Sequence, residues 1–427
     1  MNILVISKGA WRNDNNTGNT LSNIFGGMQN SEFYNIYCSA EMPENDVCKS
    51  YYRISEPELM KHFFDRNYIA GKRFSYNFSE TKPHDVKEKD DLKFFKLNRC
   101  ELFYLYRELI WNKKKWQNSE LDSYISDISP DIIFMPAYDS VYMYDIFEYV
   151  ALKTKGKAVL VFTDDYFSFN QRSFSIFFWI RRILIRHVLK KRLDLFNGLY
   201  AVSDLMKEEY EKLFRREFKT LYKGDCFEEK SVENRHKPLK LLYAGNIMAG
   251  RWKSLKEISR AIEKINADKL QMQLYIYTRN AVSDKIKDAL NNGKNSFFCG
   301  GITAEKVKQE IDSADVLVHI ESLQGGDKLK TRLSFSTKLV DYFKAGKCIF
   351  AVGWEQAASI NYLIKHDAAL VAGNKNEIEI NLRNIIENES ILDEYGKKAW
   401  ECGKQNHQID KIQTSLYKDF EALINDK

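Results

Sequence analysis

Residues 334–353, which read SFSTKLVDYFKAGKCIFAVG, decide how the second half of the chain folds. A polar start leads into an apolar-periodic helix that ends at Gly346, and the β-rich run Cys348–Val352 follows. Ser336 or Thr337 suits the N-cap. Because the start of a helix carries unpaired N–H groups and the positive end of the helix dipole, it can bind phosphate. The same residues also fit an ordinary capped helix between two strands of an α/β domain.

The length of 427 residues suits two domains, and contents of 44% apolar and 29% charged residues are typical of a globular protein. The seven cysteines are scattered without a CxxC pair, which argues against a disulfide framework or zinc site and favours the cytosol. The start of the chain is too quickly polar for a signal peptide, and no apolar run approaches the ~20 residues of a membrane span. The net charge of +6 and the lack of a recognised module argue against nucleic acid as a partner.

Apolar runs alternate with helical patterns in both halves of the chain, which predicts parallel, doubly wound sheets. The strands expected in the first half are residues 2–7, 130–135, 158–163 and 198–203, with weaker signals at 33–39 and 92–97. The strands expected in the second half are residues 239–244, 274–277, 297–299, 316–320 and 348–352.

A charged stretch without periodicity, residues 223–237, is typical of a linker. The sequence therefore predicts an N-terminal Rossmann-like domain (1–222), a linker (223–238) and a C-terminal Rossmann-like domain (239–405). A final helical segment, 406–427, can return to the N-terminal domain.

The loop expected at residues 8–20 follows the first strand, at the edge of the sheet where α/β proteins bind ligands. Gly18, between Thr17 and Asn19, lets a ligand approach the backbone. The loop lacks a GxGxxG fingerprint, and a plain surface loop fits these residues equally well.

Two acids, Asp164 and Asp165, follow the expected strand 158–163. Carboxylates at the carboxyl end of a parallel strand can position sugar hydroxyls or an acceptor nucleophile, or stabilise positive charge. Alternatively, one of them caps the next helix.

A cationic helix is expected at residues 173–193, where Arg182, Arg186 and Lys190 share one face and no acid interrupts the set. Apolar residues share another face. Such a helix suits an anionic membrane surface. A helix that packs on the core and turns its basic face to solvent is the alternative.

Two cations, Arg251 and Lys253, lie just before a helix expected at residues 255–265, and Ser336 and Thr337 lie at the start of another expected helix. Together these segments offer two positive charges and two sets of backbone N–H groups. A diphosphate needs such donors, because its charge must be neutralised as it leaves.

Two Rossmann-like halves, a charged linker and a phosphate site in the second half resemble the GT-B glycosyltransferases. The resemblance is greatest to the family 4 (group 1) type, which builds bacterial capsule and other surface polysaccharides. Residues 245–255 look like that family's donor-diphosphate loop, 298–302 like its segment near the nucleotide base, and 336–347 like its K-x-x-E-Y-x-A-x-G-K helix. The resemblance implies the GT-B fold, an α/β architecture in which two doubly wound parallel-sheet domains face each other across a cleft.

The resemblance also implies roles for individual residues. Ser336 and Thr337 would hold the distal phosphate through backbone N–H groups, and Asp341 would contact the ribose. Leu333 stands where the family's E-x7-E pair has its first Glu, which leaves the donor sugar open. The implied donor-binding residues are Gly18, Asn19, Gly245, Asn246, Arg251, Lys253, Gly301, Glu321, Ser336, Thr337, Lys338 and Asp341, and the implied catalytic residues are Asp164, Asp165, Arg251 and Lys253.

The function expected from this resemblance is transfer of a hexose from a nucleotide-diphosphate sugar to a lipid-linked or other oligosaccharide acceptor in bacterial surface polysaccharide synthesis. We expect a retaining reaction without metal or cofactor, in the cytoplasm or on the inner face of the plasma membrane. Two alternatives stay open: a nucleotide-sugar epimerase or hydrolase on the same scaffold, and a non-catalytic assembly protein that docks on the membrane.

Overall fold

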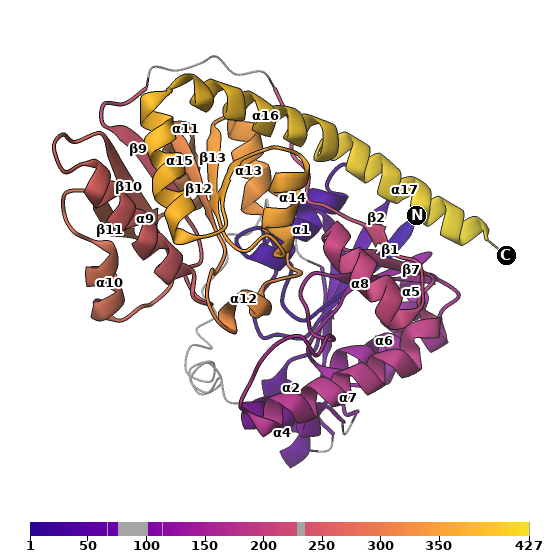
Figure 1. Cartoon of the computed structure of the whole chain (residues 1–427). Helices are drawn as coiled ribbons and strands as arrows, with labels where there is room; N and C mark the ends of the chain where they lie inside the picture. Colours follow the sequence, from indigo (N-terminus) through magenta and orange to yellow (C-terminus); the bar gives the residue numbers. More distant parts are fainter. Residues whose placement is uncertain (66, 76–100, 113, 229–234, 427) are drawn as a thin grey trace.

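A computed structural model describes residues 1–65, 67–75, 101–112, 114–228 and 235–426 of the chain. It contains an N-terminal and a C-terminal α/β unit, each built around one sheet (Figure 1). The weak strand signal at 92–97, part of the expected linker (229–234) and Cys100 lie outside the described residues. The six cysteines that the structure does describe are free.

The N-terminal sheet has the order β4-β3-β2-β1-β5-β6-β7-β8 and is parallel except for β4, which runs antiparallel to β3. Its strands are β1 (Asn2–Ser7), β2 (Glu32–Tyr37), β3 (Cys48–Arg53), β4 (Lys72–Phe74), β5 (Ile132–Pro136), β6 (Lys157–Phe162), β7 (Gly198–Ala201) and β8 (Lys219–Thr220).

The C-terminal sheet is parallel throughout, with the order β11-β10-β9-β12-β13-β14. Its strands are β9 (Leu239–Ala244), β10 (Met272–Tyr277), β11 (Ser296–Gly300), β12 (Val316–Ile320), β13 (Cys348–Val352) and β14 (Leu370–Ala372). In both sheets the strand order reverses beside the first strand, and such a reversal opens a crevice at the carboxyl ends of the strands.

Helices connect the strands. In the N-terminal unit they are α1 (Asn16–Phe25), α2 (Glu56–Phe64), α4 (Glu101–Asn112), α5 (Ser119–Ile128), α6 (Val141–Lys153), α7 (Ile176–Arg192), the 3-10 turn η1 (Leu193–Leu195) and α8 (Asp204–Phe214). In the C-terminal part they are α9 (Arg251–Ile265), α10 (Asp284–Leu290), α11 (Ala304–Asp312), α12 (Asp327–Lys330), α13 (Lys338–Ala345), α14 (Ala358–Lys365), α15 (Lys375–Glu387), α16 (Ser390–Asn406) and α17 (Ile409–Asn425). No helix in the described ranges is long and apolar enough to cross a bilayer.

The stretch 334–353 folds as its pattern predicts. Helix α13 buries Leu339 and Phe343, and it ends at Gly346, whose φ of 64° is left-handed and therefore suits glycine. All five residues of β13 are buried, because helices cover both faces of a parallel sheet. The predicted α/β architecture with two doubly wound sheets is confirmed.

Two helices begin earlier than the sequence suggested. The side chain of Asn15 accepts a hydrogen bond from the Gly18 N–H at 2.7 Å, so α1 already includes part of the expected loop 8–20. Helix α9 begins at Arg251 rather than near 255, because Gly250 turns the chain with a φ of 77°. Both shifts change which side chains point toward the site.

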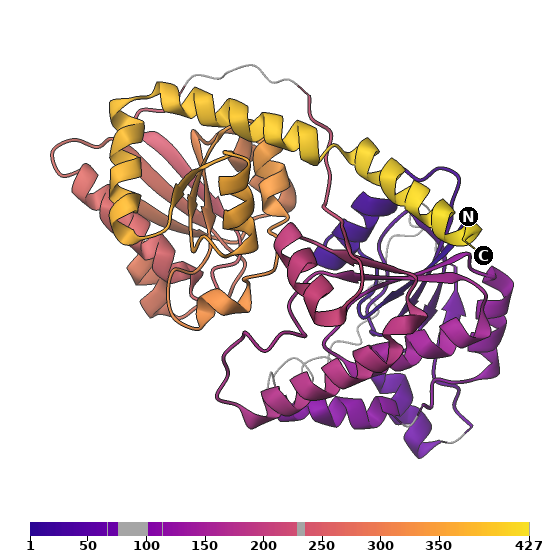
Figure 2. The ribbon, with the colours of Figure 1, turned by 45° about the vertical axis from the view of Figure 1, so that its right-hand side comes forward.

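The chain crosses between the two units at two adjacent places. The N–H of Asp225 donates to the carbonyl of His407 at 2.9 Å, and the N–H of Ile409 donates to the carbonyl of Asp225 at 3.0 Å. Beyond this crossing, α17 lies along the N-terminal unit, where it buries Leu416 and Phe420 (Figure 2). The two segments that connect the units are therefore hydrogen-bonded to each other.

Candidate functional site

A cleft of about 500 Å³ lies between the two units, where the carboxyl ends of both sheets meet. The N-terminal wall comes from α1 and from the ends of β5, β6 and β7, and the C-terminal wall from the ends of β9 and β12 and the segment before α13. The loop after β9 and the start of α13 face the same space. A ligand in the cleft can therefore contact both segments. The predicted site residues that line the cleft are Asp164, Gly245, Asn246, Arg251, Glu321, Ser336, Thr337 and Lys338.

Arg251 is held in one orientation at the floor of the cleft. Its Nη2 donates to both carboxylate oxygens of Glu321 at 2.9 Å, and its Nε donates to the carbonyl of Ile320 at 3.1 Å. Glu321 is buried and also accepts a hydrogen bond from the Thr331 hydroxyl at 2.8 Å. Among the described residues, Nη1 of Arg251 has no partner, so this nitrogen is available to a ligand.

Lys338, the first residue of α13, supplies a second cation to the cleft. Its Nζ lies 4.6 Å from the centre of the Tyr243 ring. Burial, together with the positive charge of Arg251, lowers the pKa of Lys338 to about 8. A Cβ on Gly245 would lie 2.0 Å from this Nζ, so the glycine makes the space in which the ammonium lies.

The start of α13 offers N–H groups at the same place. The N–H of Ser336 is already used, because it donates to the Ser359 hydroxyl at 2.9 Å. The N–H groups of Thr337 and Lys338 have no partner within the part of the chain that the structure describes. The backbone donors that remain for an anion are therefore those of Thr337 and Lys338, and the expected role of the Ser336 N–H is wrong.

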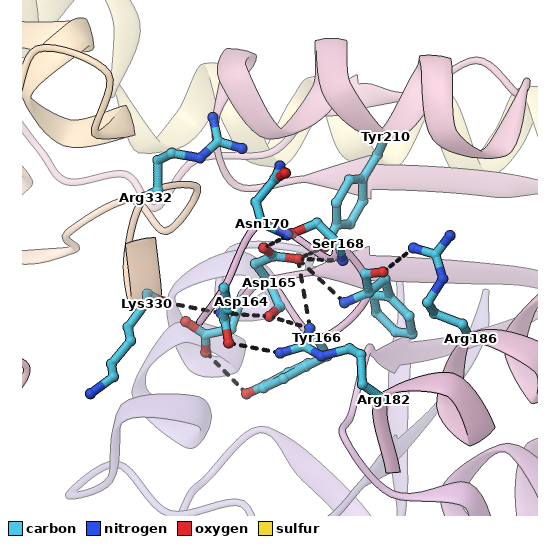
Figure 3. A network of polar contacts seen from close by, with 12 residues as sticks. Asp164, Asp165, Tyr166, Ser168, Asn170, Arg182, Arg186, Tyr210, Lys330 and Arg332 are labelled. Atoms are coloured by element: carbon cyan, nitrogen blue, oxygen red, sulfur yellow. Dashed lines mark hydrogen bonds and ion pairs between the residues drawn. The ribbon is translucent and has the colours of Figure 1, made fainter. Parts of the chain in front are cut away.

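The N-terminal wall contributes a carboxylate, Asp164, directly after β6. One of its oxygens accepts a hydrogen bond from the Ser334 hydroxyl of the C-terminal unit at 2.7 Å. The other accepts one from the Tyr166 hydroxyl at 3.2 Å (Figure 3). Asp164 thus faces the cleft and also links the two units.

Asp165, which the sequence also suggested as catalytic, is a structural residue. Its carboxylate is buried and accepts hydrogen bonds from the Ser168 N–H at 2.9 Å and the Tyr210 hydroxyl at 2.9 Å (Figure 3). Its backbone carbonyl accepts a hydrogen bond from Arg182 at 2.8 Å. These contacts fix the loop after β6, and they turn Asp165 away from the cleft.

Several other predicted residues lie elsewhere. The ammonium of Lys253 lies 3.8 Å from an Asp327 oxygen and does not line the cleft. Gly18 and Asn19 belong to α1, where a Cβ on Gly18 would lie 2.1 Å from the Arg12 carbonyl, so this glycine serves packing. Asp341 lies 3.6 Å from Lys223 and does not itself line the cleft.

Gly301 lines a separate cavity of about 680 Å³ at the ends of β10 and β11. Arg279, Phe298 and Thr303 line it too. Asn280, another of its residues, accepts a hydrogen bond from the Ile247 N–H at 2.8 Å and so ties this cavity to the loop that carries Arg251.

The sequence reasoning missed His319, which lines the cleft at the end of β12. Its only sequence signal is that a polar residue interrupts an otherwise apolar strand, Val316–Ile320. No group of three or more His, Cys, Asp or Glu side chains that could hold a metal ion occurs in the described ranges.

The expected basic face of α7 is largely turned inward. Arg182 is buried against the loop after β6, and Arg186 donates to the carbonyl of Phe167, so the prediction of a solvated or membrane-facing row is wrong for these two. Lys190 is exposed. The face of α7 that solvent reaches is instead apolar over its first half and includes Ile176, Phe177, Ile180, Ile183 and Leu184.

No known protein-family model matches the chain, and no curated protein sequence matches it significantly. Several solved structures share its fold. HepE from Anabaena, solved in complex with UDP, superposes with a TM-score of 0.63 at 10% identity over 99% of this chain and 100% of that one. Sucrose-phosphate synthase from Thermosynechococcus elongatus gives 0.62 at 12% identity over 100% of both chains.

TarM gives a TM-score of 0.53 at 13% identity over 71% of this chain, which spans 57% of the TarM chain. This chain likewise spans 60% of the matched chain of the GtfA/B complex. These structures are GT-B glycosyltransferases, and their two facing α/β units correspond to the arrangement described above. The chain therefore has the GT-B fold.

Proposed function

We propose that this chain is a glycosyltransferase that moves a sugar from a nucleotide-diphosphate donor to an acceptor bound in the cleft. The observation that carries the proposal is the convergence of Arg251, Lys338 and the free N–H groups of Thr337 and Lys338 on one wall of the cleft. HepE, whose fold is similar, has been solved with UDP and with UDP-glucose.

The proposed reaction breaks the bond between the anomeric carbon and a phosphate oxygen. The acceptor oxygen forms the new glycosidic bond, and the proton of the acceptor hydroxyl passes to the departing diphosphate. Arg251, Lys338 and the start of α13 stabilise the negative charge on the departing nucleoside diphosphate. They supply the charge that a metal ion would supply elsewhere. Asp164, on the opposite wall, accepts hydrogen bonds from sugar or acceptor hydroxyls. Retention of the anomeric configuration is proposed on the family resemblance alone.

The nucleotide base, in this proposal, occupies the cavity at the ends of β10 and β11. Phe298 offers an apolar surface there, and Arg279 and Thr303 offer polar groups. The hydrogen bond from the Ile247 N–H to Asn280 fixes the position of this cavity relative to the diphosphate site.

A thermal-shift panel of nucleotide sugars tests the proposal directly. At least one donor is expected to raise the melting temperature, because a ligand that binds only the folded state stabilises it. With that donor, transfer to an oligosaccharide acceptor should exceed release of free nucleotide in the donor-only reaction. A panel without any stabilising donor would contradict the proposal, and release without acceptor would indicate a hydrolase instead.

Anion binding in the cleft is expected to weaken as pH rises through about 8, the pKa of Lys338 in the unliganded protein. Only the ammonium form attracts phosphate, so the measured dissociation constant should rise above that pH. Calorimetric titration with the corresponding nucleoside diphosphate at pH 7, 8 and 9 measures how the dissociation constant depends on pH. The Lys338→Met variant should lose this pH dependence, and a slope that persists in the variant would assign the titration to another group.

The acceptor is proposed to be lipid-linked and presented at an anionic membrane. The exposed face of α7 supports this, since Ile176, Ile180 and Ile183 are 68%, 46% and 58% exposed. Lys190 and Lys191 follow at the end of the same helix and are also exposed. An apolar helix face with cations beside it suits the interface of an anionic bilayer. Beside it, α4 and α7 enclose a largely apolar cavity of about 920 Å³.

Co-sedimentation with vesicles that contain anionic lipid tests this docking surface. The double variant Ile180→Glu, Ile183→Glu is expected to lose vesicle binding, because it places two charges on the apolar face. Ile380→Glu is the matched control, since Ile380 is 63% exposed but lies on α15 of the C-terminal unit. Equal sedimentation of both variants would contradict docking through α7.

A further inference from the structure

His319 is a buried polar side chain at the floor of the cleft. Its side chain lies at the end of β12, is 1% exposed, and lines the cleft beside Arg251, Glu321 and Lys338. Neither ring nitrogen forms a hydrogen bond within the described residues. A buried polar group without a partner is costly to the folded state, so this imidazole calls for an explanation.

The residues that the structure describes offer the ring no acceptor within hydrogen-bond distance. The nearest recorded one, Oε1 of Glu321, lies 3.9 Å from Nε2, which exceeds hydrogen-bond distance. That carboxylate is already engaged by Arg251 and Thr331. The partner of the imidazole N–H is therefore expected to be an atom of a ligand that enters the cleft.

The charges around the ring indicate what kind of atom this is. Lys338 on α13 and Arg251 on α9 are the two cations whose charges act on His319. Glu321 faces it from the end of its own strand, and its charge is balanced by Arg251. A ligand atom shared with two cations is most stable as an anionic oxygen.

We propose that the His319 imidazole binds a phosphate oxygen of the donor's diphosphate, together with Arg251 and Lys338. This inference rests on the proposed function, and it adds a ligand from β12 to the two cations. Burial, together with the charges of Lys338 and Arg251, holds the pKa of His319 well below its usual value, so the free protein carries a neutral ring. A neutral ring has one N–H to donate, which is what a phosphate oxygen accepts.

Calorimetric titration with inorganic pyrophosphate and with UDP, in a metal-free buffer, tests the inference. Pyrophosphate reports on the phosphate subsite alone, whatever base the donor carries. His319→Phe, which keeps a planar ring but cannot hydrogen-bond, is expected to weaken pyrophosphate binding by about tenfold or more, the loss of one charge-assisted hydrogen bond. His319→Leu, a smaller side chain that also cannot hydrogen-bond, is the second variant in case the larger ring disturbs folding.

Two measurements separate binding from structural damage. The melting temperature of unliganded His319→Phe is expected to equal or exceed that of the wild type, because an unpartnered buried polar group is removed. The matched control is His187→Asn, since His187 is exposed on α7 and should leave pyrophosphate binding unchanged.

The possible outcomes distinguish this inference from the proposed function. If the wild type binds pyrophosphate and both His319 variants bind it equally well, the inference is wrong while the proposed function stands. If pyrophosphate binding is unchanged but a nucleotide sugar binds more weakly, His319 contacts the sugar, which overturns the phosphate assignment. If the wild type binds neither pyrophosphate nor any nucleotide sugar, the proposed function itself fails.

Discussion

Replacing Lys338 with Met is expected to lower kcat/KM for sugar transfer by about a hundredfold or more, while the chain stays folded. Met keeps most of the apolar stem that packs on Tyr243 but removes the ammonium. Without it, the departing diphosphate loses one of the two cations, Arg251 and Lys338, on the C-terminal wall of the cleft. The free energy of unfolding should not fall, because burial already disfavours the charged form, as the lowered pKa of Lys338 shows.

Steady-state kinetics with the donor identified by thermal shift measures this effect. The matched control is Lys256→Met, because Lys256 lies on α9 but does not line the cleft. An unchanged kcat/KM in Lys338→Met would remove the ammonium of Lys338 from the mechanism and leave the stabilisation of the leaving group to Arg251 and the start of α13. A variant that also loses its thermal transition would instead indicate a structural role.

Much of the fold was predictable because buried parallel strands have short, nearly continuous apolar sequences. β9 and β12 have the bounds that the sequence suggested, since both are central strands covered on both faces. Weaker strands such as β3 (CKSYYR) were not predicted, because their alternating polar residues resemble those of a loop. Edge strands and helix starts depend on neighbours that a local pattern does not contain.

The site was predictable in its location and only partly in its residues. Arg251 and Lys253 look equivalent in the sequence, but α9 begins at Arg251, and two helical residues differ by about 200° around the axis. If Arg251 points into the cleft, Lys253 must point away. Lys338 takes the place expected for Lys253, because Gly245 leaves room for its side chain.

Asp164 and Asp165 show the same limit in a loop. The two residues have identical side chains, but only Asp165 is buried. The fold brings Tyr210, Ser168 and Arg182 into hydrogen-bond contact with Asp165. The same contacts explain α7. Arg182 and Arg186 face inward because loop carbonyls accept their hydrogen bonds, and apolar residues of the first half of the helix remain exposed.

Leu333→Ala is expected to lower the free energy of unfolding by about 2–5 kcal/mol, the range for a large-to-small change in a well-packed core. Leu333 belongs to the C-terminal half of the sequence, yet it is fully buried in the core of the N-terminal unit. Its carbonyl accepts a hydrogen bond from the Ser203 hydroxyl at 2.8 Å, and the neighbouring Arg332 forms an ion pair with Glu209. The substitution therefore creates a cavity in one unit and loosens the segment that reaches it from the other.

Urea denaturation monitored by tryptophan fluorescence measures the decrease in the free energy of unfolding. Leu270→Ala is the control. Leu270 is 37% exposed, so its truncation should change stability by no more than about 0.5 kcal/mol. Because Ser334, the next residue, donates to Asp164 across the cleft, the loosened segment should also raise the donor KM in the folded variant. A variant that unfolds like the wild type would show that the packing of Leu333 into the N-terminal unit contributes little to stability.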